Sequence, residues 1–115
     1  MPEMQTSLTL DRRQLRDATL DDEDLMREIL AELVDDTSHQ LALLKSAIQA
    51  EIPETCMRLA HYSKGACANV GAARAADLLA SIETQASRRA FGECTASLAS
   101  LALEVERLRL EMAGI

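Results

Sequence analysis

The segment PETCMRLAHYSKGACANVG, residues 53–71, marks both ends of one helix and decides the fold. Pro53 disfavours helical geometry at the preceding residue and suits the first turn of a helix. Asn69 and Gly71 tolerate the left-handed backbone geometry with which helices commonly end. Between these ends, small and apolar residues at intervals of three and four predict a stripe that faces inward and lets neighbouring helices pack closely: Cys56, Leu59, Ala60, Ser63, Cys67 and Val70.

The chain before this segment predicts one long helix that runs to about residue 50. Thr19, followed three residues later by Asp22, has the pattern of a helix start, and the carboxylates at 21–24 suit the positive end of a helix dipole. Asp35-Asp36-Thr37 interrupts the apolar stripe midway. The stripe consists of Leu25, Ile29, Leu30, Leu33, Val34, Leu41, Leu44 and Ile48.

Three further helices complete the expected architecture. We expect a short helix over about 10–18, a helix over about 72–89 and, after Gly92, a final helix over about 93–112. Four amphipathic helices with short connections bury their stripes together as an up-down-up-down antiparallel bundle. The apolar positions of the last two helices are Leu78, Leu79, Ile82, Leu98, Leu101, Val105, Leu108 and Met112.

The composition supports an all-α fold in a single domain. Ala, Leu, Glu, Arg, Gln and Met dominate, and four Gly, two Pro and 2% aromatic residues leave little material for turns or strands. The 115 residues suffice for one core, so we expect a domain over 1–115, with an N-terminal segment 1–20 and a four-helix bundle at about 21–112. The formal net charge of −7 argues against nucleic acid as a partner.

The cysteines and the hydropathy pattern indicate in which cellular compartment the protein resides. Cys56, Cys67 and Cys94 form neither a close pair nor an even set, and the N-terminus has no signal-peptide pattern. No stretch approaches the roughly 18 apolar residues that span a bilayer. We therefore expect a cytoplasmic protein without membrane insertion.

His61 has the most distinctive surroundings in the chain. It lies to one side of the inward stripe, so we expect its ring to reach solvent beside Arg58, Lys64, Gly65 and Ala68. Cationic and small residues around an imidazole suit a phosphate that another macromolecule delivers. Glycine inside a helix lowers its stability by roughly 0.5 to 1 kcal/mol relative to alanine. Two explanations for Gly65 are close approach by a partner and close helix packing in the bundle.

These residues resemble the histidine-containing phosphotransfer (HPt) domain. The similarity rests on His61-x-x-Lys64-Gly65, then Ala66, Gly71-Ala72 and Ile82-Glu83, and it extends over nearly the whole chain. Two positions depart from the family pattern. Ser63 stands where a large apolar residue is usual, and Ala75 stands where a leucine is usual.

The two departures concern packing. We expect the Ser63 hydroxyl to donate to the Leu59 carbonyl. Tyr62 and Leu78 are expected to fill part of the missing volume.

The resemblance implies a phosphorelay. His61 would accept a phosphoryl group from an aspartyl phosphate on a receiver domain and pass it to an aspartate on another. Lys64 would offset the charge of the phosphoryl oxygens. Gly65 and Ala68 would leave the approach to the ring open, and Met57 and Arg58 are candidate docking contacts.

The same resemblance implies the partners. These are a response-regulator receiver domain, a hybrid sensor kinase, or both, and the family's Mg²⁺ belongs to the receiver, so we expect no cofactor and no metal site in this chain. We expect a monomer. His39 has no Lys-Gly pair beside it, and we assign it no role.

Three other functions remain open. A catalytic histidine kinase is disfavoured because Tyr62 and Lys64-Gly65 follow His61, where that family has an acidic residue and then a proline, and because no glycine-rich nucleotide loop is present. The phosphoacceptor domain of a chemotaxis-type kinase has the same bundle and a similar motif. We prefer the relay because nothing after Met112 suggests a linker. A module that binds a receiver or kinase without carrying phosphate is the third alternative.

Overall fold

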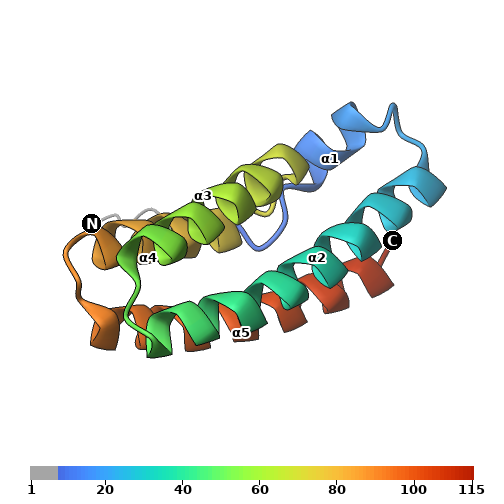
Figure 1. Ribbon diagram of the computed structural model, residues 1–115. Coiled ribbons are helices and arrows are strands. Elements are labelled where there is room, and N and C mark those ends of the chain that lie inside the picture. The colour runs from blue at the N-terminus through green and yellow to red at the C-terminus, as the bar shows by residue number, and fades with distance from the viewer. Residues whose placement is uncertain (1–7) are drawn as a thin grey trace, which may run out of the picture.

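Helices account for all of the regular secondary structure in residues 8–115, the part of the chain that the computed structural model describes (Figure 1). In chain order they are α1 (Arg12–Ala18), α2 (Glu23–Gln49), α3 (Pro53–Val70), α4 (Ala73–Ser87) and α5 (Phe91–Ala113). Each of the four long helices packs against two others, in the pairs α2–α3, α3–α4, α4–α5 and α2–α5. The expected all-α antiparallel bundle with a short additional N-terminal helix is confirmed.

The start of α2 differs from the expected one. Asp22 is its N-cap, and the Asp22 side chain accepts a hydrogen bond from the Leu25 amide at 3.1 Å. Thr19 instead ends α1, and its hydroxyl donates to the Leu15 carbonyl at 2.8 Å. The prediction of a helix start at Thr19 was wrong because Leu20 and Asp21 both adopt positive φ, which separates Thr19 from the next helix.

Gly71 ends α3 as expected and also holds α1 in place. Its φ of 93° is the left-handed conformation that favours glycine. Its carbonyl accepts from the Asp11 amide at 2.7 Å, and a Cβ there would lie 2.9 Å from the Asp11 carbonyl oxygen. Gln14 adds a hydrogen bond to the Ala68 carbonyl at 2.7 Å, so α1 satisfies carbonyl groups at the end of α3.

The connection between α4 and α5 was predicted at Gly92, and this is wrong. Gly92 lies inside α5, whose first residue is Phe91. The chain turns earlier, where Arg89 has a φ of 59° and its amide donates to the Ala86 carbonyl. A left-handed residue that is not glycine carries no sequence signal, so the nearby glycine misplaced the turn.

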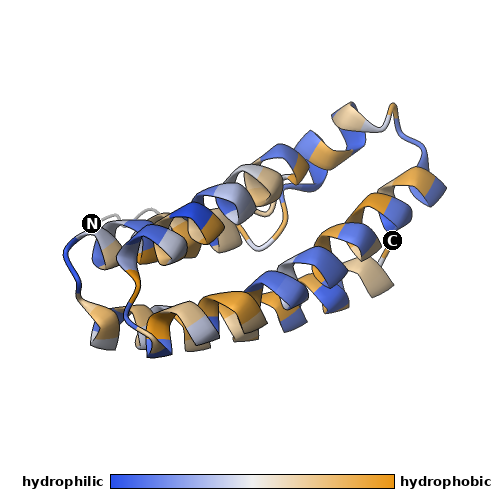
Figure 2. Cartoon of the chain, in the orientation of Figure 1, coloured by the Kyte–Doolittle hydropathy of each residue, from blue (hydrophilic) through white to orange (hydrophobic). Residues whose placement is uncertain are grey.

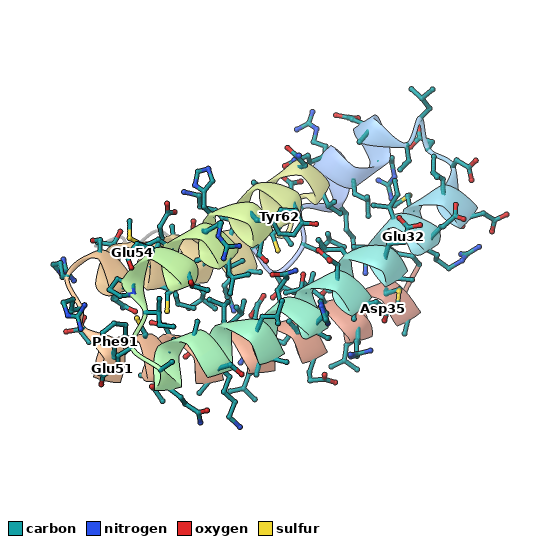
Figure 3. All side chains as sticks on the ribbon, in the orientation of Figure 1. Glu32, Asp35, Glu51, Glu54, Tyr62 and Phe91 are labelled. Carbon is teal, nitrogen blue, oxygen red and sulfur yellow. The ribbon has the colours of Figure 1, made fainter. Side chains whose placement is uncertain are left out.

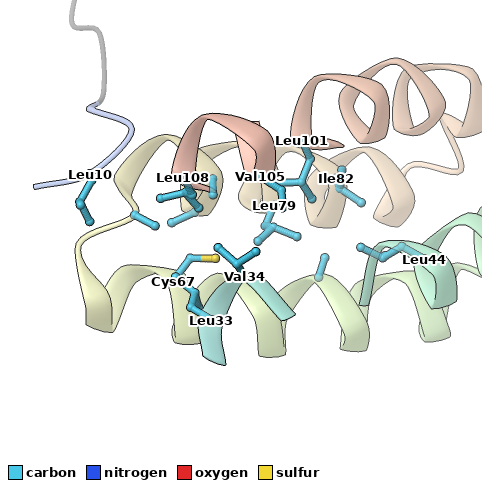
Figure 4. Packing of buried hydrophobic residues seen from close by; sticks show 14 of the residues in the cluster. Leu10, Leu33, Val34, Leu44, Cys67, Leu79, Ile82, Leu101, Val105 and Leu108 are labelled. Carbon is cyan, nitrogen blue, oxygen red and sulfur yellow. The ribbon is translucent and has the colours of Figure 1, made fainter. Parts of the chain in front are cut away.

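Apolar side chains from all five helices and from Leu10 fill the interior (Figure 4), while each helix carries hydrophilic residues on its other face (Figure 2). Thr37, expected to interrupt the stripe of α2, is buried, with its hydroxyl 3.9 Å from the Cys67 sulfur. The fully buried large apolar side chains are Leu15, Met26, Leu30, Leu44, Leu79, Ile82, Leu101, Leu108, Val34 and Val105. No helix within residues 8–115 combines the length and the apolar character that crossing a bilayer requires.

The packing around Ser63 differs from the expectation in two respects. Its hydroxyl is buried without a hydrogen-bond partner among the described residues, so the predicted bond to Leu59 is not made. Tyr62 is 56% exposed and its hydroxyl donates to Asp36, so the ring does not fill core volume. Leu78 does pack against the core.

Glu51, at the turn between α2 and α3, provides a test of backbone strain (Figure 3). It is exposed and has a φ of 54°, which costs a residue with a side chain roughly 1–2 kcal/mol. We expect Glu51→Gly to raise the free energy of unfolding by about 0.5–1 kcal/mol in urea denaturation. The control is Ala50→Gly, because Ala50 has right-handed geometry, and this variant should lose stability. Equal effects of the two variants would contradict the argument.

Candidate functional site

An exposed stripe on α3 carries the candidate residues. Arg58, His61, Gly65 and Ala68 recur at three and four along one face, and all four are exposed. The His61 side chain is 69% exposed, which confirms the expectation that the ring reaches solvent. The buried stripe of Cys56, Ala60, Ser63 and Cys67 occupies the other side of the same helix.

Glu83 of α4 binds the two functional candidates of α3 at once. Its Oε1 accepts from the Lys64 ammonium at 2.8 Å, and its Oε2 lies 3.2 Å from Nδ1 of His61. The carboxylate therefore holds the imidazole and the ammonium side by side at the α3–α4 edge of the bundle.

This contact fixes which nitrogen of His61 is available for chemistry. An ionised carboxylate only accepts hydrogen bonds, so Nδ1 of His61 must carry a proton to interact with Glu83. In a neutral imidazole the other nitrogen, Nε2, then has the lone pair. The exposed ring thus presents a nucleophilic nitrogen whose orientation is set by Glu83.

The Lys64 hydrogen bond is the main reason why the pKa of Glu83 lies below its usual range. Partial burial opposes this shift, and the charges of Lys64 and His61 add to it. Glu83 is consequently ionised at neutral pH, as its contact with Nδ1 of His61 requires.

Gly65 leaves open space beside the ring. A Cβ added to Gly65 would meet no atom within 4 Å outside its own helix turn. The alternative that Gly65 permits close helix packing is therefore wrong. Ala68, one turn further along the stripe, is also small and exposed.

The surface between α2 and α3 has two hollows. Arg58, with Leu43, Ile52 and Leu59, lines a hollow of about 420 Å³ between α2 and α3. A second hollow of about 280 Å³, toward Val70, includes Tyr62 and Asp36. Of the two predicted docking residues, Arg58 is exposed, whereas Met57 is half-buried and packs against the core.

The other histidine and the cysteines do not join this site. His39 is exposed on α2, and the three cysteines are buried as free thiols. Burial raises the pKa of the Cys67 thiol to about 11, so it stays protonated. Among residues 8–115 no three His, Cys, Asp or Glu side chains gather as a metal site.

Glu83 is the site residue that the sequence reasoning did not assign. It was noted only beside Ile82, as part of a similarity. The sequence did contain a signal for it. Ile82 belongs to the buried stripe of α4, and Glu83 follows Ile82, so Glu83 can face the neighbouring antiparallel helix α3. Choosing Glu83 from sequence would have required the register between α3 and α4.

Comparisons with known proteins agree with the fold. The model of the Hpt family, described as "Hpt domain", matches residues 28–111. The crystal structure of histidine-containing phosphotransfer protein B (HptB) from Pseudomonas aeruginosa PAO1 superposes with a TM-score of 0.84 at 26% sequence identity, covering 95% of each chain. The search of curated proteins found no match.

The contact between Glu83 and Lys64 predicts a pH-dependent stability. A lowered carboxyl pKa adds stability that is present above the unfolded-state pKa and is lost as the pH falls through the lower folded-state value. We expect Glu83→Gln to cost up to about 1 kcal/mol at pH 7, because the group is partly exposed. The cost should begin to fall near the ordinary glutamate pKa of about 4.3 and vanish only below the lower folded-state pKa. Urea denaturation over a pH series measures the difference. The control is Glu93→Gln, and a pH-independent cost for Glu83→Gln would contradict the assignment.

Proposed function

The chain belongs to the Hpt domain family, and from this premise we propose that His61 is the phosphoacceptor of a phosphorelay. In this function His61 takes a phosphoryl group from an aspartyl phosphate on a receiver domain and gives it to an aspartate on another. The observation that carries the proposal is the exposed ring, held at Nδ1 by Glu83, with a lysine on one flank and open space on the other.

The proposed transfer uses the nitrogen that Glu83 leaves free. Nε2 of His61 attacks the phosphorus of the aspartyl phosphate, the bond between phosphorus and the carboxyl oxygen breaks, and the receiver's aspartate leaves as a carboxylate. The proton on Nδ1 stays hydrogen-bonded to Glu83, so the positive charge of the phosphorylated ring is balanced by a carboxylate. Onward transfer is the same step in reverse with a second aspartate.

Lys64 has two roles in the proposal. Its ammonium lies 2.8 Å from Glu83 and next to the ring, where it offsets the negative charge that spreads over the phosphoryl oxygens during transfer. It also lowers the pKa of Glu83, the carboxylate that accepts from Nδ1 of His61. Lys64 therefore assists both the phosphoryl group and the nucleophile.

A receiver domain as the partner would explain why His61 projects from the surface instead of lying in a pocket. A catalytic pocket surrounds its substrate, whereas the exposed His61 ring projects from a helix and has Glu83 as its hydrogen-bond partner among the described residues. The remaining groups that phosphoryl transfer requires, including Mg²⁺, would come from the receiver domain. Arg58 and the hollow beside it are candidate contacts for that domain.

His61→Gln should abolish phosphoryl uptake, because glutamine has no nucleophilic ring nitrogen. The measurement mixes the protein with a phosphorylated receiver domain and Mg²⁺ and follows the phosphorylated form on a Phos-tag gel. His39→Gln is the control and should take up phosphate as the wild type does. Uptake of phosphate by His61→Gln would refute the proposed acceptor.

Gly65→Leu should slow the transfer by at least about tenfold, since a side chain in the open space would displace the receiver from the ring. The bundle itself should keep its helicity, because a Cβ at Gly65 meets no neighbour. Gly92→Leu is a matched control, because Gly92 is also an exposed helical glycine with open space around it. Circular dichroism checks the fold, and equal transfer rates for both variants would remove the close-approach argument.

A further inference from the structure

The outward face of α5 carries an apolar strip that the phosphorelay does not use. Ala96, Ala99, Leu103 and Leu110 are spaced at three, four and seven residues, so they lie along one face. Leu103 is 61% exposed and Leu110 is 75% exposed. The core-facing side of α5 is separate and holds Leu101, Val105 and Leu108. We call these four exposed residues the Leu103 strip.

A hollow lies directly beside the Leu103 strip. It is a groove of about 540 Å³ between α2 and α5, the largest of the described hollows, lined by Leu41, Ala42, Lys45, Leu98, Ala99 and Ala102. Ala99 belongs to both the groove and the strip. A projecting leucine and an apolar groove therefore stand side by side on one surface.

This arrangement suits a two-fold interface. In an interface between two identical copies, the same patch faces itself, so it must hold both a projection and a hollow that fits it. We propose that two copies of this chain associate through antiparallel α5 helices, related by a two-fold axis that passes between Ala99 and Leu103. Leu103 of each copy then enters the groove of the other, beside Ala99 and Ala102.

The charges at the rim of the groove fit the same pairing. Lys45 is exposed at the rim, and no ion pair joins it to another described residue. Glu106 follows Leu103 by one helical turn and is exposed, with Arg109 as its partner in the same helix. In the antiparallel arrangement Glu106 of one copy comes within reach of Lys45 of the other, which gives two equivalent opposite-charge contacts.

The proposed interface leaves the phosphoacceptor site accessible. His61 and Glu83 lie at the α3–α4 edge, whereas the strip and the groove lie at the α2–α5 edge. Since α2 packs on α3 and α4 packs on α5, these two edges are on opposite sides of the bundle. Each copy of the dimer can therefore present its own His61 to a receiver. This inference differs from the sequence-based expectation of a monomer, and the oligomeric state in solution decides between them.

Sedimentation velocity of the full chain, from micromolar to near-millimolar concentration, tests the proposal. We expect the wild type to shift from monomer to dimer mass across the series. Leu103→Lys should weaken dimerisation about a hundredfold, because it removes two buried leucines at once. Leu20→Lys is the matched control, since Leu20 is 88% exposed but lies outside the strip, and it should leave the dimer intact.

Charge reversal tests the register of the pairing. Lys45→Glu should weaken the dimer severalfold, and Glu106→Lys in the same chain should restore part of the loss. Circular dichroism melting confirms that each variant is folded, and phosphoryl transfer to His61 should be unchanged in Leu103→Lys. Wild-type protein that stays at monomer mass over the whole series would overturn the proposal. Equal dimerisation of Leu103→Lys and Leu20→Lys would overturn it as well.

Discussion

The close packing of α3 on α4 is the constraint on which the candidate site depends. The fully buried residues of α3 are all small, Cys56, Ala60, Ser63 and Cys67, and α4 contributes the buried alanines Ala75, Ala76 and Ala86. Small side chains at a helix interface let the two backbones approach. This approach brings Glu83 of α4 close enough to hold both His61 and Lys64. A larger residue in the interface would move the carboxylate away from the ring without touching it.

Some polar atoms in the interior of the bundle are unsatisfied. The Ser63 hydroxyl is buried without a hydrogen-bond partner among the described residues, and so is Oε2 of Glu104. The other oxygen of Glu104, Oε1, accepts from Arg107 at 3.0 Å. An unsatisfied buried polar group costs about 1–3 kcal/mol. Ser63 is thus one of the small residues in the interior of the bundle, but its unpartnered hydroxyl carries this cost.

The sequence was sufficient for the helices and for the side of α3 on which the histidine lies. Pro53 and Gly71 bracket α3, and the periodic stripe predicted that His61 would be exposed, because both signals are local. The turns at Thr19 and Gly92 were misplaced, since Leu20, Asp21 and Arg89 adopt left-handed geometry that their residue types do not announce. The pairing of Glu83 with Lys64 was missed for another reason. It depends on the register of two helices, which is set by packing over their whole length.

Gly65 and Gly71 show how the fold and the proposed function can be separated residue by residue. Gly71 is required by the structure itself, because its φ is positive and a Cβ would collide with the Asp11 carbonyl oxygen. Gly65 has neither constraint, although it lowers the stability of an exposed helix relative to alanine by roughly 0.5–1 kcal/mol. No contact that Gly65 makes within the described chain compensates for this loss of helix stability. The proposed function would supply a reason for Gly65, because an in-line transfer between two proteins requires a second surface to approach α3 here, one turn from His61.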